Sequence, residues 1–394
     1  MISVNEAKKE VVKNSKHLSK NILSVENALD CVLANDIFSP INLPPFNQSS
    51  MDGYAFILED LLNNIPIHII GEIAAGKNFS YKLKSGEAIR IFTGAKIPEG
   101  SNCVVMQEKT TVEGIKLNIN DSKLIKGANI RYKGAQINSG QLALKKGTVL
   151  TPASIGFIAS MGINTVEVYS KPKISIIITG SELQKPGSTL IEGNVFESNS
   201  YSLIAALKNM LIKPIKIETI TDNKEETYQA IKKAIEESDL VILTGGISVG
   251  DYDFVSETLE ELKVETIFYK VKQKPGKPLF FGKKNDTLVF ALPGNPAAVL
   301  TCFYNYVYPS IKIMQGHSNI FLRTLMLPIS KEFLKNKALS YFLKSKINAN
   351  SVTPLEGQES YILSSFAVAD SLIYLPENSE LITKDTLVEV FLLP

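Results

Sequence analysis

The stretch DLVILTGGISVGDYDF spans residues 239–254, and the fold of the chain depends on it. Its first half is an apolar run typical of a strand that is buried on both faces. The run ends in a glycine-rich turn, and the following DFVSETLEELK predicts a helix. Such a turn presents backbone N–H groups at a helix start, where they bind anions. The carboxylates of Asp251 and Asp253 are therefore unexpected in this turn.

Two common nucleotide-binding motifs are excluded for this turn. A P-loop carries Lys followed by Ser or Thr after its last glycine, whereas Asp251 and Tyr252 follow Gly250 here. The glycine spacing also differs from that of a dinucleotide-binding fingerprint. The turn therefore predicts an anion cradle of another kind.

Strands and helices alternate on both sides of this stretch. KISIIITG, PIKIETIT and TLVFAL predict strands, and SYSLIAALKNM, KEETYQAIKKAIEES and PGNPAAVLTCFYNYVYPSIKIM predict helices. The helix KEETYQAIKKAIEES follows a cap at Asp222 or Asn223. This order indicates an α/β domain whose sheet is covered by helices on both faces. Ligands of such domains lie outside the carboxyl ends of the strands.

The flanking regions have different patterns. Apolar spacing predicts helix over residues 3–38, and the proline-rich segment 39–55 predicts a loop. Short strands between glycine turns indicate a small β domain from 65 to about 150, and residues 151–162 predict a helix with a threonine cap that rejoins the amino-terminal helices. Residues 318–394 return to strands and predict a small β-barrel or sandwich.

Composition limits the function classes. The 394 residues have a formal net charge of +2 and no long basic run, so we expect no nucleic-acid partner. No apolar stretch is long enough to span a bilayer, and the amino terminus does not resemble a signal peptide, which favours a cytoplasmic protein without a membrane partner. The three cysteines are odd in number and far apart, so we expect reduced, packed thiols. The isolated histidines, His17, His68 and His317, favour surface or packing roles over metal binding.

Three strand-end turns, ITGSEL (178–183), LTGGISVGDYD (243–253) and LPGNPAA (292–298), should meet at one edge of the sheet. Each alone is consistent with a tight turn and no ligand. Glu182 lies in the first turn, and with Asp251 and Asp253 it supplies the hard oxygen ligands that Mg²⁺ prefers. Such an ion would lie between carboxylate and phosphate. Asp253 is equally suited to cap the following helix.

The segment YKVKQKPGKP (269–278) carries four lysines, Lys270, Lys272, Lys274 and Lys277. If the first three alternate on a strand they share one face, and the turn brings Lys277 to the same edge of the sheet. This cluster predicts a second anion site, and the alternative is a solvated edge strand.

Taken together, the motifs resemble the MoeA family of molybdopterin molybdenumtransferases, which includes the gephyrin E domain. The matching segments are PPFNQSSMDGYA (44–55), RIFTGAKIPEG (90–100), ITGSEL, DLVILTGGISVGDYDF, KPGKPLFFG (274–282), LPGNPAA and, more weakly, SYILSSF (360–366). The resemblance implies a central three-layer α/β domain of the molybdenum cofactor biosynthesis fold, a β domain, a two-segment helical domain and a C-terminal β-barrel. The implied boundaries are 1–43 with 140–172 for the helical domain, 44–139 for the β domain, 173–317 for the α/β domain and 318–394 for the barrel.

The resemblance also implies an activity. Members of the family convert adenylylated molybdopterin and molybdate to molybdenum cofactor, release AMP and use Mg²⁺. They form homodimers in which each cleft combines the α/β domain of one subunit with the β domain of the other. An upstream adenylyltransferase and molybdoenzyme delivery factors are the implied protein partners.

Residue roles follow from the matching motifs. Glu182 and Asp253 match the acidic positions associated with Mg²⁺ and the nucleotide phosphates, and Asp52 and Thr93 match positions needed for activity. Asp52 is the better candidate for acting on a bound water or on the incoming metal. The substrate cradle matches Gly245, Gly246, Ser248 and Gly250, with Asp239 at the base of its strand. The molybdate pocket matches Lys274, Lys277, Pro293, Pro296 and Ser360.

Three positions depart from the family pattern. Gln136 and Asn47 stand where acidic residues are usual, and Ser181 stands where aspartate is frequent. We expect the absence of an acidic group at Gln136 either to reduce turnover or to be compensated by Asp251. Two other functions remain open: a tungsten-inserting paralogue, and a dimeric scaffold without catalytic activity.

Overall fold

The computed structural model describes residues 1–77, 80–247 and 254–394. The chain divides into two compact units. The first contains Met1–Leu23, Asp30–Ala34 and Glu167–Pro394, and the second contains Ser24–Leu29 and Asn35–Val166. The strands β1 (Lys20–Ser24) and β12 (Thr165–Tyr169) pair where the chain passes between the units. The finer division into four domains stays a prediction.

An α/β sheet forms the centre of the first unit, with the strand order β16-β13-β17-β21-β20-β18. The first four strands are parallel, and β20 runs antiparallel to both of its neighbours. Every residue of β13 and β17 is buried, as their continuous apolar runs predict. The strands are β13 (Ile174–Thr179), β16 (Lys216–Ile220), β17 (Leu240–Thr244), β18 (Glu265–Tyr269), β20 (Phe280–Lys284) and β21 (Thr287–Leu292).

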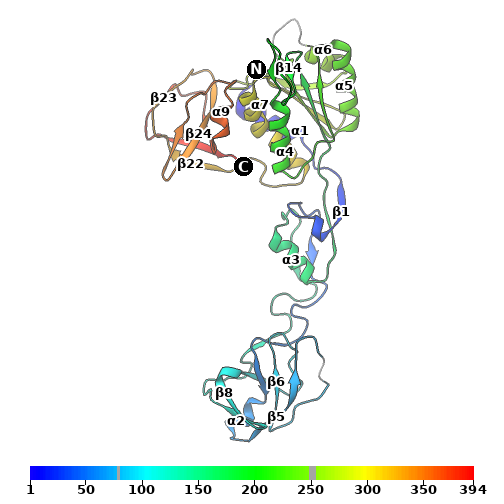
Figure 1. The fold of residues 1–394 in the computed structure, drawn as a ribbon, viewed down its shortest axis with the longest axis vertical. Helices are drawn as coiled ribbons and strands as arrows, with labels where there is room; N and C mark the ends of the chain where they lie inside the picture. Colours follow the sequence, from blue (N-terminus) through cyan, green and yellow to red (C-terminus); the bar gives the residue numbers. More distant parts are fainter. Residues whose placement is uncertain (78–79, 248–253) are drawn as a thin grey trace. The chain divides into compact units, whose positions relative to one another are not determined.

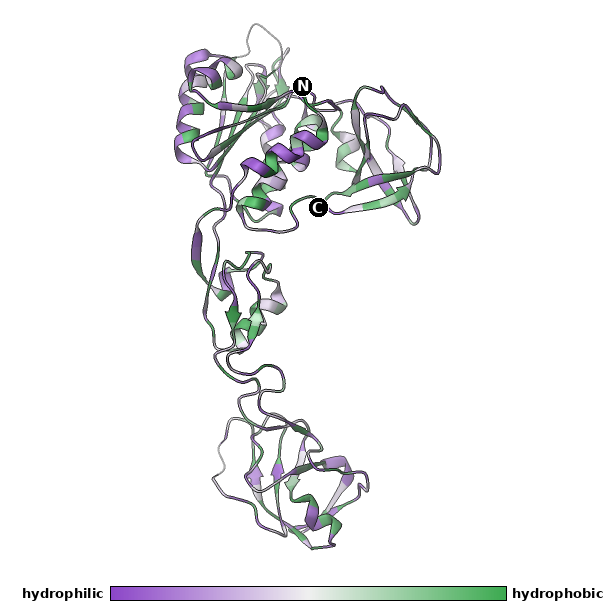
Figure 2. Cartoon of the chain, turned by 180° about the vertical axis from the view of Figure 1, so that it is seen from behind, coloured by the Kyte–Doolittle hydropathy of each residue, from purple (hydrophilic) through white to green (hydrophobic). Residues whose placement is uncertain are grey.

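Helices cover both faces of this sheet (Figure 1). On one face, α5 and α6 share a core with Ile177, Val241 and Val289, and on the other face α1, α4, α7 and α8 share a core with Ile176, Ile242 and Phe290. The buried residues of α5 recur at helical spacing, and its outer side is largely hydrophilic (Figure 2). The bounds are α1 (Val4–Asn14), α4 (Asn199–Asn209), α5 (Lys224–Glu237), α6 (Phe254–Glu261), α7 (Pro296–Cys302), the π-helix η3 (Phe303–Val307) and α8 (Tyr308–Met314).

The prediction of helix over residues 3–38 is wrong beyond Asn14. Ser15 is extended, and its hydroxyl donates to the carbonyl of Val11, which ends α1. Residues 20–24 then form β1, because pairing with β12 satisfies their backbone groups. Apolar residues at helical spacing, such as Ile22, are exposed there. Tertiary pairing therefore overrides the local pattern.

The carboxy-terminal strands of the first unit form a second sheet in the order β19-β24-β26-β28-β22, and β25 pairs with β24. Its inner residues Phe342, Leu372 and Phe391 share the core that contains α1 and α7, so the two sheets of this unit are joined by apolar packing. The bounds are β19 (Gln273–Lys274), β22 (Thr324–Pro328), β23 (Phe333–Leu334), β24 (Ser340–Asn348), β25 (Ser351–Pro354), α9 (Ser364–Ala367), β26 (Ser371–Leu375), β27 (Leu381–Ile382) and β28 (Leu387–Leu392). The pairs β23–β27 and β14–β15 (Leu183–Gln184 and Val195–Phe196) complete the unit.

The second unit contains a sheet in the order β7-β4-β6-β5-β9-β8. Its strands confirm the predicted β region, but the segment 39–55 predicted as a loop contains β3 and the start of β4. Gly53 starts β4, and a Cβ atom there would overlap the carbonyl oxygen of Val105, so a glycine lets the strands approach. The bounds are β3 (Gln48–Ser49), β4 (Gly53–Phe56), α2 (Leu58–Leu62), β5 (Ile67–Ile73), β6 (Glu87–Ile91), β7 (Cys103–Met106), η2 (Gln107–Lys109), β8 (Thr110–Glu113), β9 (Lys116–Ile119) and β10 (Ile130–Arg131).

The helix predicted over residues 151–162 is confirmed as α3 (Pro152–Ser160). The Thr151 hydroxyl accepts a hydrogen bond from the Ser154 amide, and Pro152 occupies the first turn. This helix packs against η1 (Val25–Asn27) rather than against α1. The short strands β2 (Ile37–Phe38) and β11 (Leu142–Leu144) pair in the same unit.

The cysteines are free and buried, as predicted: Cys31, Cys103 and Cys302. Burial raises the pKa of each thiol, so these groups are poor nucleophiles at neutral pH. Across the described residues, no helix combines the length and the hydropathy that a bilayer crossing needs.

Candidate active site

A cavity of about 790 Å³ lies at the carboxyl ends of the parallel strands of the first unit. Thr179, Gly180 and Glu182 reach it from the end of β13, residues 244–247 from β17 and residues 293–296 from β21. The predicted meeting of these three turns is confirmed. The amino-terminal end of α4, Asp222, Pro278 and the exposed Tyr361 of the carboxy-terminal region also line it.

Two glycines after β17 shape the floor of the cavity. Gly245 has φ +90° and Gly246 has φ +58°, backbone conformations that favour glycine. A Cβ atom on Gly245 would lie 2.7 Å from the Thr179 hydroxyl oxygen and closer still to the Thr179 carbonyl oxygen. The glycine therefore allows the β17 turn to pack directly against the end of β13.

We expect Gly245→Ala to destabilise the α/β domain by on the order of 2 kcal/mol, because alanine adds both a steric overlap and backbone strain. Thermal unfolding measures the loss. Gly294→Ala is the matched control, since a Cβ atom there would meet nothing nearer than 3.8 Å. Equal unfolding temperatures for the two variants would contradict the expectation.

The polar lining is held by a network at the start of α4. The Asn199 side-chain nitrogen (Nδ2) donates to the Thr244 hydroxyl at 3.1 Å and to the Gly294 carbonyl at 2.8 Å. The Thr244 hydroxyl in turn donates to the Pro293 carbonyl at 3.1 Å. Asn199 thereby fixes the β17 and β21 turns relative to each other.

Three carboxylates line the cavity, those of Glu182, Glu197 and Asp222. The Glu197 carboxylate accepts hydrogen bonds from the Ser200 amide and hydroxyl. Glu182 is exposed in the β13 turn, and Asp222 follows β16. Asp222 accepts a hydrogen bond from the Ser181 amide at 2.9 Å, and its own amide donates to the Ser181 hydroxyl at 3.0 Å. Ser181, one of the departures from the family pattern, thus holds a carboxylate from the neighbouring strand.

Four residues predicted in the β17 turn lie outside the described residues. They are Ser248, Gly250, Asp251 and Asp253. Within residues 1–77, 80–247 and 254–394, no group of three or more His, Cys, Asp and Glu side chains is arranged to hold a metal ion. Among the predicted metal ligands, Glu182 is therefore the one that the structure places at the cavity.

Four of the five predicted molybdate residues, all except Lys274, lie at or beside the cavity. Pro293 and Pro296 line it. The Ser360 hydroxyl accepts a hydrogen bond from the Asn295 side chain at 2.8 Å, and Asn295 is itself part of the lining. Lys277 is exposed and directly precedes the lining residue Pro278.

The prediction of one alternating strand through Lys270, Lys272 and Lys274 is wrong. The strand β18 ends at Tyr269, and Lys270 has φ +65°, which turns the chain out of the α/β sheet. Lys274 then belongs to β19, which pairs with β24 of the second sheet. Its ammonium lies 5.5 Å from the centre of the Tyr341 ring.

Asp239 lies away from the cavity. It precedes β17, at the end of the strand opposite the glycine turn, and its carboxylate accepts a hydrogen bond from the Lys173 amide at 2.7 Å. That bond connects the starts of β13 and β17. The structure therefore gives Asp239 a contact within the sheet and no place in the cavity lining.

Asp52 and Thr93 are brought together in the second unit. The Asp52 carboxylate accepts hydrogen bonds from the Thr93 amide at 2.7 Å and from its hydroxyl at 2.8 Å. The two residues meet because Gly53 pairs with Ile91 across β4 and β6. The Thr93 amide, followed by its hydroxyl, lowers the pKa of Asp52, so this exposed carboxylate is ionised at neutral pH.

The other two departures also lie in the second unit. Gln136 lines a cavity of about 630 Å³ together with Pro44, Gln48 and Arg131. The Asn47 side chain accepts a hydrogen bond from the Lys133 amide at 2.8 Å. An amide at Asn47 is thus compatible with the loop geometry.

Three successive parts of the chain match models of known protein families. The MoeA N-terminal region (domain I and II) matches residues 2–162, a probable molybdopterin binding domain matches 175–313, and the MoeA C-terminal region (domain IV) matches 330–393. The molybdopterin molybdenumtransferase of Staphylococcus aureus (strain Mu50) is 31% identical over 96% of this chain and 92% of its own length. The chain belongs to the MoeA family.

Other relatives agree with this membership. The molybdopterin molybdenumtransferase of Haemophilus influenzae is 38% identical, over 75% of this chain and 72% of its own length. The crystal structure of a molybdopterin biosynthesis MoeA protein from Pyrococcus horikoshii OT3 aligns over 100% of both chains with a TM-score of 0.84 and 28% identity. The predicted MoeA-type fold class is confirmed.

Sequence reasoning did not single out several residues of the cavity lining, among them Asp222, Glu197, Asn199, Asn295 and Tyr361. Of the two residues predicted as the cap of α5, Asp222 and Asn223, the structure uses Asn223, whose side chain accepts from the Glu226 amide. The position of Asp222 after a parallel strand was the available indication. The alternation of strands and helices gives no comparable indication for Tyr361, which lies in the loop between β25 and α9.

Proposed function

We propose that this protein is a molybdopterin molybdenumtransferase, which converts adenylylated molybdopterin and molybdate to molybdenum cofactor and AMP. The observation that carries the proposal is the cavity at the strand ends, which combines a positive-φ glycine pair with carboxylates in a MoeA-family chain. The cavity volume of about 790 Å³ suits a small organic substrate, since pockets for drug-sized ligands measure about 300–1,000 Å³.

The glycine turn after β17 is the proposed cradle for the adenylylated substrate. Gly245 and Gly246 leave the backbone open to a close approach by a phosphate group. Ser248 and Gly250 belong to the same proposed cradle. Asp239 contributes indirectly in this proposal, by fixing the start of the strand that carries the turn.

Mg²⁺ is the proposed metal, and the donor set at the cavity fits it. Mg²⁺ is commonly bound by one or two carboxylates, with water and phosphate oxygens completing its shell. Glu182 and Asp253 are the proposed ligands, and Asp222 supplies a further carboxylate to the same cavity. When bound, the ion neutralises charge on the phosphoanhydride.

Molybdate is the proposed second substrate, at the rim formed by Pro293 and Pro296. The hydroxyl of Ser360 supplies hydrogen bonding, and Lys274 and Lys277 supply positive charge. Since phosphoanhydride cleavage depends mainly on positioning and charge neutralisation, no covalent nucleophile is needed.

We also propose a homodimer in which the Asp52–Thr93 pair of one subunit acts at the cavity of the other. Subunit mixing tests this arrangement. Dimers formed from Asp52→Asn and Glu182→Gln subunits should recover activity that neither variant has alone, because one of the two clefts is then intact. A dimer by light scattering without any such recovery would refute shared clefts.

The decisive experiment supplies purified protein with adenylylated molybdopterin, Mg²⁺ and a low concentration of molybdate. We expect AMP release and activation of a molybdenum-free apoenzyme. Absence of both would refute the enzymatic function and leave the scaffold. Faster turnover with tungstate would favour tungsten insertion. The adenylyltransferase and molybdoenzyme delivery factors remain the proposed partners, in the cytoplasm.

A further inference from the structure

Lys344, in β24, is a lysine buried inside the carboxy-terminal region, with 2% of its surface exposed. Its ammonium donates to three backbone carbonyls, those of Gly357 at 2.6 Å, Glu359 at 3.1 Å and Ile362 at 3.0 Å. All three acceptors lie in the segment 355–362, which we name the serine loop because it carries Ser360. Lysine is rarely buried so completely unless its charge is satisfied, and here the loop backbone satisfies it.

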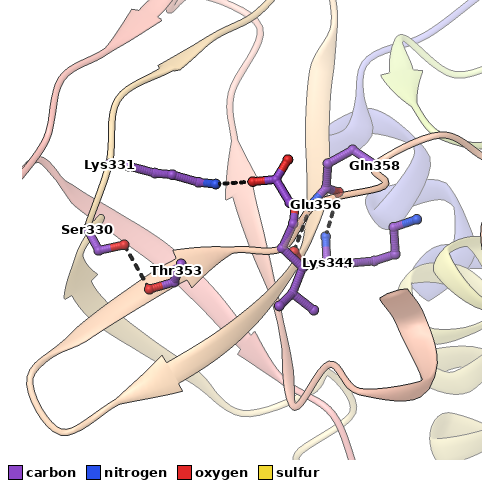
Figure 3. Close-up of polar contacts among 7 residues, drawn as sticks. Ser330, Lys331, Lys344, Thr353, Glu356 and Gln358 are labelled. Carbon is purple, nitrogen blue, oxygen red and sulfur yellow. Dashed lines mark hydrogen bonds and ion pairs between the residues drawn. The ribbon is translucent and has the colours of Figure 1, made fainter. Parts of the chain in front are cut away.

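The backbone of Lys344 holds the same loop from the other side. Its amide donates to the Gln358 side-chain oxygen at 3.0 Å, and the Gln358 amide group donates back to the Lys344 carbonyl at 2.8 Å (Figure 3). The Leu355 amide also donates to that carbonyl, at 2.9 Å. One residue of a central strand therefore fixes both the path and the interior of the serine loop.

The serine loop reaches the rim of the cavity. The Ser360 hydroxyl accepts from Asn295 at 2.8 Å, and the Ser360 carbonyl accepts from the Ala297 amide at 3.0 Å, in the first turn of α7. The next residue, Tyr361, lines the cavity. The conformation of the loop therefore sets the position of the Ser360 hydroxyl beside Asn295 and Pro296.

We propose that Lys344 is a positioning residue for molybdate. Its buried ammonium holds the serine loop in the conformation that places Ser360 at the cavity edge where molybdate is proposed to bind. This inference rests on the proposed function and adds to it a residue that does not touch the substrate. A cation with several N–H donors is needed because three carbonyls converge on one point. An apolar side chain would remove the charged donor from all three, leaving the Ser365 hydroxyl beside the Gly357 and Ile362 carbonyls and the Ile362 amide beside the Glu359 carbonyl. Losing a charged hydrogen-bond donor at a buried site is costly, so the loop is expected to loosen.

Lys331, which pairs with the first part of the serine loop, provides a matched control. Lys331 pairs with Glu356 at 2.7 Å, and these side chains are 46% and 94% exposed (Figure 3). Exposed ion pairs contribute little to stability, and this one touches none of the three loop carbonyls. Lys331→Met therefore removes a lysine beside the loop without removing its internal support.

The test compares Lys344→Met with Lys331→Met in steady-state AMP release at varied molybdate. We expect Lys344→Met to raise the KM for molybdate about 10-fold or more while kcat at saturating molybdate changes less than about 3-fold, because binding rather than chemistry is affected. Lys331→Met should match the unsubstituted protein. Amide exchange at Ala297 should accelerate in Lys344→Met, since its acceptor is the Ser360 carbonyl, whereas Val299, bonded to Asn295, keeps its protection.

A loss confined to kcat, or an unchanged molybdate KM in folded Lys344→Met, would overturn the proposal. If Lys344→Met does not fold, Ser365→Ala takes its place, because it removes a neutral donor to two of the same carbonyls, at 2.7 Å from Gly357 and 3.5 Å from Ile362. A smaller rise in molybdate KM is then expected, and no rise overturns the proposal. If the unsubstituted protein releases no AMP, the proposed function fails, and exchange at Ala297 alone decides whether Lys344 holds the loop.

Discussion

Glu182→Gln is expected to lower turnover by about 10²–10³-fold, the range seen when one electrostatic contact to a transition state is lost. The substitution keeps the size of the side chain and removes the charge that the proposed Mg²⁺ needs. Glu182 is exposed at the cavity, so the change costs little folding stability. The measurement is AMP release at saturating substrate over a range of Mg²⁺ concentrations.

The Mg²⁺ dependence separates a ligand from a residue that merely lies nearby. A weakened site requires more Mg²⁺, so part of the lost rate should return at high concentration. Glu192→Gln is the control, since Glu192 is exposed in the same connection between β13 and α4 but is not part of the lining. Normal AMP release by Glu182→Gln at low Mg²⁺ would exclude Glu182 from the metal site.

The α/β core could be predicted from the sequence because its strands are buried on both faces. Such strands are continuous apolar runs, as in β13 and β17, and their carboxyl ends meet at one edge whatever the lengths of the connections. This rule predicts that Glu182, Gly245 and Pro293 lie at one edge of the sheet, and in the structure all three line one cavity there.

Regions whose structure depends on distant partners were not predictable in the same way. The segment 20–24 has helix-like apolar spacing but becomes a strand because β12, far along the chain, pairs with it. The lysine segment 270–274 turns at Lys270 because β19 joins the carboxy-terminal sheet. Local periodicity contains no information about either partner.

The pairing of Asp52 with Thr93 illustrates a third case. The sequence supplied both residues only through family resemblance, since neither a Met-Asp-Gly turn nor a Phe-Thr-Gly turn predicts chemistry alone. Their contact follows from the register of β4 on β6, in which Gly53 is opposite Ile91. Gly53 and Ile91 are 38 residues apart in the sequence, and the register that pairs them is set by packing of the whole sheet.

Asp52→Asn is expected to reduce turnover by about 10³-fold, within the range for loss of a group that acts on a proton or a bound water. Asparagine preserves the hydrogen bonds from Thr93 if its oxygen faces them, so the fold of the second unit should persist. The lost property is the negative charge. Circular dichroism checks the fold, light scattering checks the dimer, and AMP release measures the effect.

The pKa of Asp52 makes this prediction specific. Bonds from the Thr93 amide and then the Thr93 hydroxyl lower it from its ordinary value of 3.8, so the carboxylate keeps its charge as the pH falls through that value. Whatever these bonds contribute to stability is present above the unfolded-state pKa and is lost only as the pH falls through the lower folded-state pKa. Asp52 therefore cannot cause an acid limb of the activity profile near neutral pH.

Thr93→Val removes the hydroxyl donor but keeps the amide, so it should raise the Asp52 pKa part of the way back to its ordinary value. A carboxyl-carbon NMR titration measures this change. An activity profile that follows Asp52 near pH 6 would contradict an always-ionised carboxylate and favour proton transfer by a neutral acid.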